Sequence, residues 1–182
     1  MSTWTEFEAA APDMATAAAQ LWSGITRLRR EEAGFVPSGA PVFPIAYLAT
    51  VRADGSPRLH PFCPILAGEG LFAAIPPASP KGRDLRRDGR CVIHALPGPN
   101  DDELCIRARA VEVADPTTRA MIAALVERSG IGGMIESVSH HPLFEFQIEQ
   151  IDVARWIDVG QPGTRSERQR WRPAPGLSVA GR

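Results

Sequence analysis

A serine, a lysine and an arginine in the first half of the chain have the types and spacing that suit phosphate binding. Lys81 is the only lysine in the chain, and it stands two residues after Ser79, where a short helix is expected to begin. A phosphate dianion needs cations and hydrogen-bond donors that converge on one point, and a helix N-terminus adds oriented backbone N–H groups. Arg58 follows a tight turn on a strand that can lie beside the run at 71–75, so its guanidinium could form the opposite wall. These residues predict one phosphate pocket.

The histidines do not predict a metal site. The chain has four of them, and their spacing matches no ligand pattern such as H-x-x-x-H or C-x-x-C, so we expect no bound metal. His94 lies in an apolar run and is interpreted as a hydrogen-bonded core histidine. His140 and His141 precede Pro142 in an expected surface loop, where the sharper alternative is a haem ligand.

The elements that must position these residues follow an antiparallel pattern. Asp54-Gly55 separates two strand-like runs and is a strong hairpin signal, although three prolines interrupt the second run. Further strands are expected at 71–75, 91–96, 104–113 and 143–159, and helices at 13–30, 79–88 and 115–130. Six strands in hairpin order, with helices before and between them, predict an α+β fold built on a six-stranded antiparallel barrel.

Composition indicates a globular protein with one core. Apolar residues make up 44% of the chain and the net charge is −1, values that argue against a disordered chain, a membrane protein or a nucleic-acid binder. The acidic N-terminus does not resemble a signal peptide, so we expect a cytoplasmic protein, and the three cysteines are interpreted as core thiols. Residues 1–160 are expected to form a single domain. Residues 161–182 are polar and predict a tail that folds only if something holds it.

Three motifs in this order resemble a known family. They are R-x-D-G-x-P-R-x-H-P at 52–61, LFAAI at 71–75 and S-x-K at 79–81. Together they resemble the FMN-binding split-barrel superfamily that includes pyridoxamine 5'-phosphate oxidase. The resemblance covers residues 35–115 and extends less closely to the last strand and to R-W-R-P at 170–173. It implies a six-stranded split β-barrel with flanking helices.

The resemblance also implies a cofactor site, position by position. Arg58 and Lys81 would bind the FMN phosphate with help from Ser79, strand residues Leu59, His60 and Pro61 would run along the isoalloxazine ring, and Ala74 and Ile75 would offer it main-chain groups. Members of the family form homodimers with the flavin at the interface. Trp171 in the tail, or Trp156, would then contribute to the partner's site.

The function that the resemblance implies is an FMN-dependent oxidoreductase acting on an unidentified small molecule, with His60 as the candidate proton donor. His60 and Pro61 stand where the family commonly has aliphatic residues, and no second basic cluster reproduces a substrate-phosphate site, so pyridoxamine phosphate is not the expected substrate. Two alternatives remain open. One is a reductase that uses the deazaflavin F420 and binds its acidic tail in a groove formed by Arg83, Arg86 and Arg87. The other is a non-catalytic module that binds flavin or haem.

Overall fold

A computed structural model describes residues 3–18, 45–67, 70–95, 102–129 and 132–174. Its strands form one sheet in the order β2-β1-β5-β6-β7-β4-β3, with β8 beside β7. The strands are β1 Ala46–Val51, β2 Pro57–Phe62, β3 Ile65–Ala67, β4 Gly70–Ala74, β5 Arg90–Ala95, β6 Glu103–Glu112, β7 Leu143–Ile157 and β8 Arg165–Trp171. The helices are α1 Trp4–Ala10, α3 Pro80–Arg87, α4 Pro116–Ser129 and α5 Gly132–His140.

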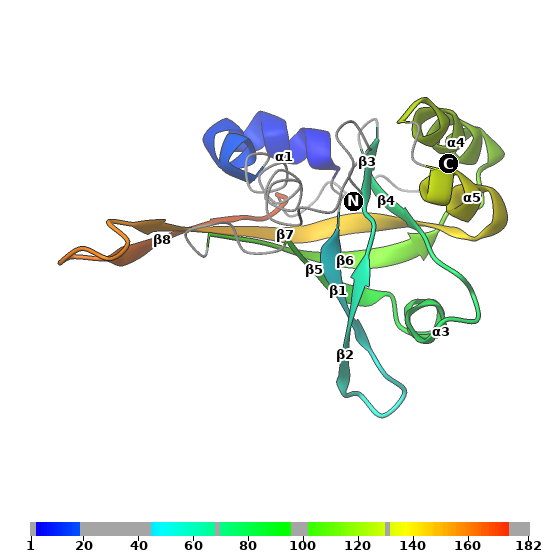
Figure 1. Cartoon of the computed structure of the whole chain (residues 1–182), viewed down its shortest axis with the longest axis horizontal. Helices are drawn as coiled ribbons and strands as arrows, with labels where there is room; N and C mark the ends of the chain where they lie inside the picture. The colour runs from blue at the N-terminus through cyan, green and yellow to red at the C-terminus, as the bar shows by residue number, and fades with distance from the viewer. Residues whose placement is uncertain (1–2, 19–44, 68–69, 96–101, 130–131, 175–182) are drawn as a thin grey trace.

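The sheet confirms the expected fold class and corrects the number of strands. All pairings are antiparallel, and the sheet curls into the half-barrel of a split-barrel fold (Figure 1). The sheet has eight strands rather than six. One extra strand arises because the run after the hairpin divides at Cys63-Pro64 into β2 and β3, as expected where a proline cannot donate to the ladder.

The other extra strand lies in the segment interpreted as a tail. Residues 165–171 form β8, which pairs with β7 from Ile157 back to Ile151 and extends from one end of the molecule (Figure 1). All its residues but the last are exposed, so the sequence carries no apolar alternation that would reveal a strand. The last residue, Trp171, packs against the core with its ring centroid 5.3 Å from that of Phe7. Pairing with β7 and packing on Phe7 therefore hold this segment in place.

The main core joins the strands of the sheet to α1. It includes Leu48, Ile93 and Ile106 from neighbouring strands, and α1 adds Trp4 and Phe7 (Figure 1). The sequence analysis did not predict α1, although Thr3 and Glu6 form a capping box at its start, a signal readable as T-x-x-E. Of the helix expected at 13–30, residues 12–18 are helical and the remainder lies outside the described residues.

A second, smaller core joins α4 and α5 to β3 and β4. Its members are Ile65, Ala67, Phe72, Ile122, Val126, Met134, Val138 and Leu143. The expected helix at 115–130 is confirmed as α4, with the Asp115 carboxylate accepting hydrogen bonds from the N–H groups of Thr117 and Thr118. No helix in the described ranges is long and apolar enough to cross a membrane.

Helix α3 is confirmed where Ser79 predicted it. It begins at Pro80 with Ser79 as its N-cap, and it packs beside β1 and β6 below the sheet (Figure 1). The β1–β2 hairpin turns through Gly55, whose φ of +83° requires the freedom of glycine. The hairpin and α3 together form a corner of the molecule, and we call this the β2–α3 corner.

Candidate functional site

The β2–α3 corner brings together the two cations that the sequence singled out. The Arg58 Nε–H donates to Asp84 Oδ2 at 2.7 Å, and the Lys81 ammonium donates to the Pro61 carbonyl at 3.0 Å. Lys81 and Asp84 are one helical turn apart, while Pro61 and Arg58 are three residues apart in the reverse direction along β2. The helix therefore runs alongside the strand, and both cationic side chains lie in the space between them.

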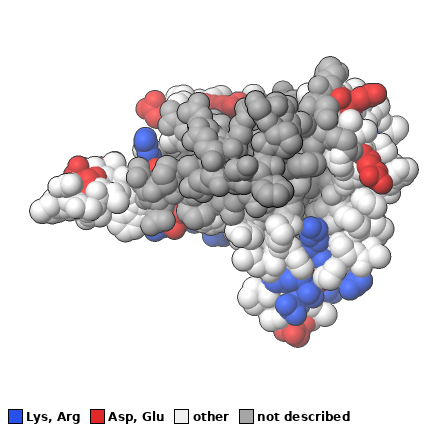
Figure 2. Space-filling view, viewed as in Figure 1, with Lys and Arg blue, Asp and Glu red and all other residues white. Residues whose placement is uncertain are grey.

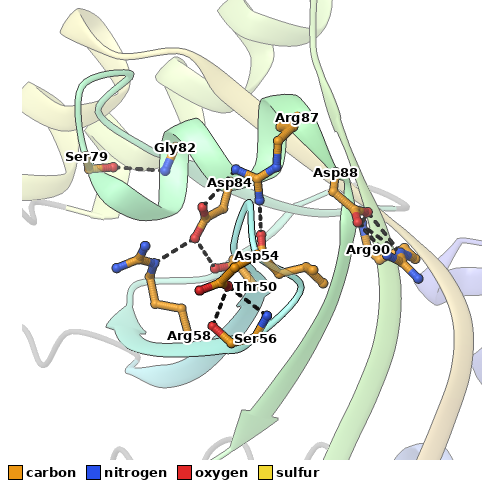
Figure 3. Close-up of polar contacts among 11 residues, drawn as sticks. Thr50, Asp54, Ser56, Arg58, Ser79, Gly82, Asp84, Arg87, Asp88 and Arg90 are labelled. Atoms are coloured by element: carbon orange, nitrogen blue, oxygen red, sulfur yellow. Dashed lines mark hydrogen bonds and ion pairs between the residues drawn. The ribbon is translucent and has the colours of Figure 1, made fainter.

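Asp84 is the centre of this corner, as Figure 3 shows. Its carboxylate also accepts a hydrogen bond from the Thr50 hydroxyl at 2.9 Å and one from Arg87 Nη1 at 3.3 Å, and the residue is 3% exposed. Thr50 is the partner of Arg58 in the β1–β2 ladder. Burial alone would raise the pKa of the Asp84 carboxyl, but hydrogen bonds from Arg58 and Thr50 outweigh burial and hold the pKa below its ordinary value. Asp84 is thus an anion at neutral pH.

His60 lies two residues from Arg58 and therefore on the same face of β2. Its Nε2 atom is buried and has no hydrogen-bond partner among the described residues. Burial lowers the pKa of His60, and the positive charges of Lys81 and Arg58 lower it further. His60 is consequently neutral at neutral pH.

The alternation of β2 separates the three residues expected along the flavin ring. Leu59 is 62% exposed and points to the opposite face from Arg58 and His60. Pro61 shares the face of Leu59, but its carbonyl turns to Lys81. A ligand that runs along one face of β2 meets the side chain of His60 or those of Leu59 and Pro61, and the placing of all three along a flavin ring stays a prediction.

The first turn of α3 is held tightly against the preceding segment. The Ser79 hydroxyl donates to the Pro76 carbonyl at 2.6 Å and accepts from the Gly82 N–H at 3.1 Å. A Cβ on Gly82 would lie 2.4 Å from the same Pro76 oxygen, so only glycine allows this approach. The structure gives Ser79 a capping role with its proton already used, and a bond from Ser79 to a phosphate stays a prediction.

Ala74 and Ile75 lead directly into this turn, close to the start of α3. The Ile75 side chain is buried in the core, and its N–H donates to the Pro142 carbonyl at 3.0 Å. That N–H is already bonded, which leaves the carbonyl of Ile75 and the main chain of Ala74 as the groups that the prediction can still use.

The other arginines of α3 have partners of their own. Arg86 makes two hydrogen bonds to the Glu112 carboxylate, Arg87 donates to Asp84 and to the Val51 carbonyl, and Arg83 donates to the Ala78 carbonyl. Positive side chains still gather over α3 and the hairpin, at the lower right of Figure 2. The corner is basic, but most of this charge does not point into one open groove.

The remaining candidates lie outside the β2–α3 corner of this chain. His94 is half-buried and lines a groove on the outer face of the sheet with Cys105 and Asp152, so its interpretation as a core histidine is wrong. His140 ends α5 and is exposed, rather than lying in a loop. Trp156 lies half-buried on β7, where its backbone N–H donates a hydrogen bond to the Asp102 carboxylate.

The prediction that all three cysteines are core thiols is confirmed for one of them and wrong for two. Cys91 is buried, which raises the pKa of its thiol to about 12, as expected for a core thiol. Cys63 and Cys105 are only half-buried, so the core interpretation is wrong for them. In the part of the chain that the structure describes, no group of three or more histidine, cysteine or acidic side chains could hold a metal ion.

Sequence reasoning missed the residues that organise the corner. Asp84 was assigned no role from the sequence, yet in S-x-K-x-x-D it stands one turn after Lys81 and therefore on the same side of the helix. Gly82 follows Lys81 within the first turn of a helix, where a glycine costs stability unless close packing requires it. Both signals were present in the sequence.

Comparison with known proteins agrees with this architecture. Residues 41–160 match the family model described as pyridoxamine 5'-phosphate oxidase, which covers well over half of the chain. No curated protein matched the sequence.

Solved structures with a similar fold include three from different bacteria. HutZ, the haem storage protein of Vibrio cholerae, is 25% identical over 58% of this chain and 81% of its own, with a TM-score of 0.49. A haem-binding protein from Mycobacterium smegmatis is 19% identical over 69% of this chain, with a TM-score of 0.52, and this chain spans only 52% of its length. A protein from Clostridium acetobutylicum, related to general stress protein 26 of B. subtilis and of the pyridoxinephosphate oxidase family, is 9% identical over 81% of this chain and 95% of its own, with a TM-score of 0.52. The family match over residues 41–160 shows that the chain belongs to the pyridoxamine 5'-phosphate oxidase family of FMN-binding split barrels.

Proposed function

We propose that the chain binds FMN, with the flavin phosphate at the β2–α3 corner, and that it is an oxidoreductase acting on a small organic molecule. The observation that carries the proposal is the meeting of Arg58 and Lys81, from two different elements, on the side of β2 that faces α3. Membership of the family supports the choice of a flavin over other phosphate compounds.

The donor set fits a phosphate monoester. Such a group carries close to two negative charges at neutral pH. Arg58 offers a planar guanidinium whose Nε is bonded to Asp84, which leaves its terminal amino groups for two phosphate oxygens, and Lys81 offers a compact point charge.

Bound FMN would supply hydride transfer at its N5 atom, so the protein needs no nucleophile of its own. The chain would contribute position and electrostatics. Arg58 and Lys81 would fix the phosphate end, and the backbone at Ala74 and Ile75 would border the ring. His60 remains our candidate catalytic residue. Because burial and the neighbouring cations lower its pKa, it would act at neutral pH mainly as a neutral hydrogen-bonding group, and as an acid only through a small protonated fraction.

The proposed assembly is a homodimer with the cofactor at its interface. Leu59 and Tyr47 are 62% and 37% exposed on the outer face of β1 and β2, an unusual position for large apolar side chains. A second copy covering this face would bury them beside the β2–α3 corner. Trp171 packs on Phe7 in its own chain, and its contribution to the partner's site remains a prediction.

The two alternatives gain no support from the corner itself. An F420 tail would need free cations along α3, but Arg83, Arg86 and Arg87 are already hydrogen-bonded. A haem would need an axial ligand, and His140 lies at the exposed end of α5, while His94 lies in the groove beside β8, away from the corner. Neither is therefore our choice.

The test begins with the absorption spectrum of the purified protein and with titration of FMN and of riboflavin, which lacks the phosphate. We expect flavin bands and tighter binding of FMN than of riboflavin. Arg58→Ala and Lys81→Ala should each weaken FMN binding at least tenfold, as expected for the loss of a charge-assisted hydrogen bond. Arg165→Ala, in an exposed ion pair on β8, is the matched control and should leave FMN binding unchanged. Equal affinity for the two flavins, or a Soret band, would exclude the proposal.

Turnover measurements distinguish an enzyme from a module that only binds the flavin. Reduction of the bound flavin by NADH or NADPH, followed by fast reoxidation with an organic acceptor, is expected of an oxidoreductase. A flavin that stays oxidised with both nucleotides, and that no acceptor reoxidises after chemical reduction, would favour a storage or sensing role instead.

A further inference from the structure

Asp84 is a buried carboxylate that the proposed chemistry does not use. It is 3% exposed, whereas the neighbouring acidic residue on the chain, Asp88, pairs only with the exposed Arg90. Burial of a carboxylate is costly unless charged and polar donors surround it. Asp84 meets this condition through donors from β1, from β2 and from its own helix.

The way in which Asp84 bonds Arg58 matters for a ligand. The bond of 2.7 Å goes to Nε, not to the two terminal amino groups. An arginine side chain has several rotatable bonds, and fixing it on ligand binding costs free energy that a preformed contact avoids. With Nε held, the guanidinium plane is set before a ligand arrives, and its outer edge is turned away from Asp84 (Figure 3).

The charge of Asp84 would weaken an anion site if nothing offset it. Arg87 bonds the other oxygen of the carboxylate, and in Figure 3 it lies on the opposite side of Asp84 from Arg58. Arg87 therefore neutralises the charge of Asp84 on the side away from Arg58. The positive charges of Arg58 and Lys81 remain available to a ligand.

We propose that Asp84 is a positioning residue that gives the site its preference for a phosphate-bearing flavin over the same flavin without phosphate. It does so by holding the Arg58 guanidinium through Nε and by tying β2 to α3, which carries Lys81. This inference rests on the proposed function. Asp84 touches neither the flavin nor its phosphate and acts through Arg58.

A purely structural role would give a different result. If Asp84 only ties α3 to the sheet, its loss weakens binding of every flavin to the same degree. If Asp84 acts only as a negative charge near the phosphate, its neutralisation strengthens FMN binding. The positioning role predicts a selective loss for FMN.

The experiment measures dissociation constants for FMN and riboflavin in the full chain, by quenching of flavin fluorescence. Asp84→Asn should weaken FMN binding about tenfold and leave riboflavin binding within about twofold, as expected for the loss of one oriented charge-assisted contact. Asp84→Glu keeps the charge but moves the carboxylate by one methylene, and it should also lose FMN preference. Asp88→Asn, one turn further along the chain, is the control and should change neither constant.

Two further comparisons keep the result decisive. In an Arg58→Lys background, which has no Nε–H, Asp84→Asn should cause no further loss of FMN preference. Thr50→Val leaves every charge in place and removes only the hydrogen bond that orients Asp84, so it should give a smaller loss of the same kind and serves if neither Asp84 variant folds. A wild-type protein that prefers FMN, together with variants at 84 and 50 that keep this preference, would overturn the inference alone. A wild-type protein with no preference for FMN would overturn the proposed function with it.

Discussion

The β2–α3 corner and the β7–β8 hairpin use the same chemical pair, arginine with a carboxylate, in opposite surroundings. In the corner, Arg58 and Asp84 meet at 2.7 Å with side-chain exposures of 23% and 4%. On the hairpin, Arg170 and Asp152 meet at 2.6 Å with exposures of 59% and 29%. The distances are nearly equal, so distance alone does not distinguish the two pairs.

Burial does distinguish them. An exposed ion pair is screened by water and salt and contributes about 0–1 kcal/mol. A buried carboxylate that has lost its water depends on each donor around it, and removing one member of such a network leaves other charges or hydroxyls without partners. The β7–β8 hairpin is therefore stabilised by its backbone ladder and by Trp171, whereas the β2–α3 corner is stabilised by the bonds to Asp84.

The largest expected effect is that of Asp84→Ala. The substitution leaves the buried Thr50 hydroxyl and Arg58 without this acceptor and leaves Arg87 only the Val51 carbonyl, and we expect the free energy of unfolding to fall by about 3 kcal/mol. Denaturant unfolding followed by circular dichroism measures it. Asp152→Ala on the β7–β8 hairpin removes an acceptor of Arg170 and of the buried Gln150 amide, but the Asp152 side chain is 29% exposed, so we expect a smaller loss than that of Asp84→Ala. Equal losses for the two variants would remove the distinction between the regions.

The next effect is that of Gly82→Ala, which tests how closely α3 must approach the sheet. The added methyl would meet the Pro76 carbonyl at 2.4 Å, and a backbone atom cannot swing aside as a side chain can. Overpacking of this kind costs roughly 1–3 kcal/mol, against a gain of about 1 kcal/mol from helix propensity. We expect a net loss of stability in thermal unfolding, together with weaker FMN binding because the first turn of α3 shifts.

A graded series checks that prediction. Gly82→Ser should be at least as harmful as Gly82→Ala, because both add a Cβ in the same place. A gain in stability for the alanine variant would mean that the first turn of α3 can move at little cost, and the corner would then be less rigid than its contacts indicate.

The sequence predicted those parts of the molecule whose signals are local. The Asp54-Gly55 hairpin, the Ser79 cap and the Asp115 cap each rest on residues within a few positions, and each was placed correctly. Strand β8 escaped because its side chains face water on both sides, and its strand character comes only from pairing with β7. Such pairing is a property of the whole fold and leaves no local pattern.

The site shows the same limit. Arg58 and Lys81 were found because their residue types and motif spacing are visible in the sequence. The partners that hold them, Asp84 for Arg58 and the Pro61 carbonyl for Lys81, lie 26 and 20 residues away along the chain, and only the fold brings them together. Side chains alternate along β2, so the opposite orientations of Leu59 and His60 could have been deduced from the sequence. Leu59, His60 and Pro61 were instead predicted to lie along one flavin ring.

A smaller effect concerns the pH dependence of stability at the corner. The pKa of His60 is lower in the folded protein than its ordinary value of 6.5, because burial and the nearby cations oppose protonation. As pH falls below that value, the unfolded chain takes up a proton that the folded chain does not, so the free energy of unfolding decreases down to the folded pKa. His60→Gln should reduce this decrease between pH 7.5 and pH 5.5, measured by urea unfolding at both values.

Asp84 does not confuse this measurement. Its pKa is also lowered, but from 3.8, so the stability that it contributes is lost only at more acidic pH. A His60→Gln variant whose stability falls as steeply as that of the wild type between the two pH values would show that His60 is not the group responsible.

The smallest expected effect is that of Arg170→Ala on the hairpin. Its guanidinium donates to Asp152 across the β7–β8 pair, but the Arg170 side chain is 59% exposed, Asp152 keeps the Gln150 amide as a donor, and the backbone ladder and the contact of Trp171 with Phe7 remain. We expect a loss of less than about 1 kcal/mol in the free energy of unfolding, falling further at 1 M salt, where the screening length is only about 3 Å. A loss above 2 kcal/mol that persists in salt would mean that β8 depends on its ion pairs. Burial would then no longer explain why the corner and the hairpin differ.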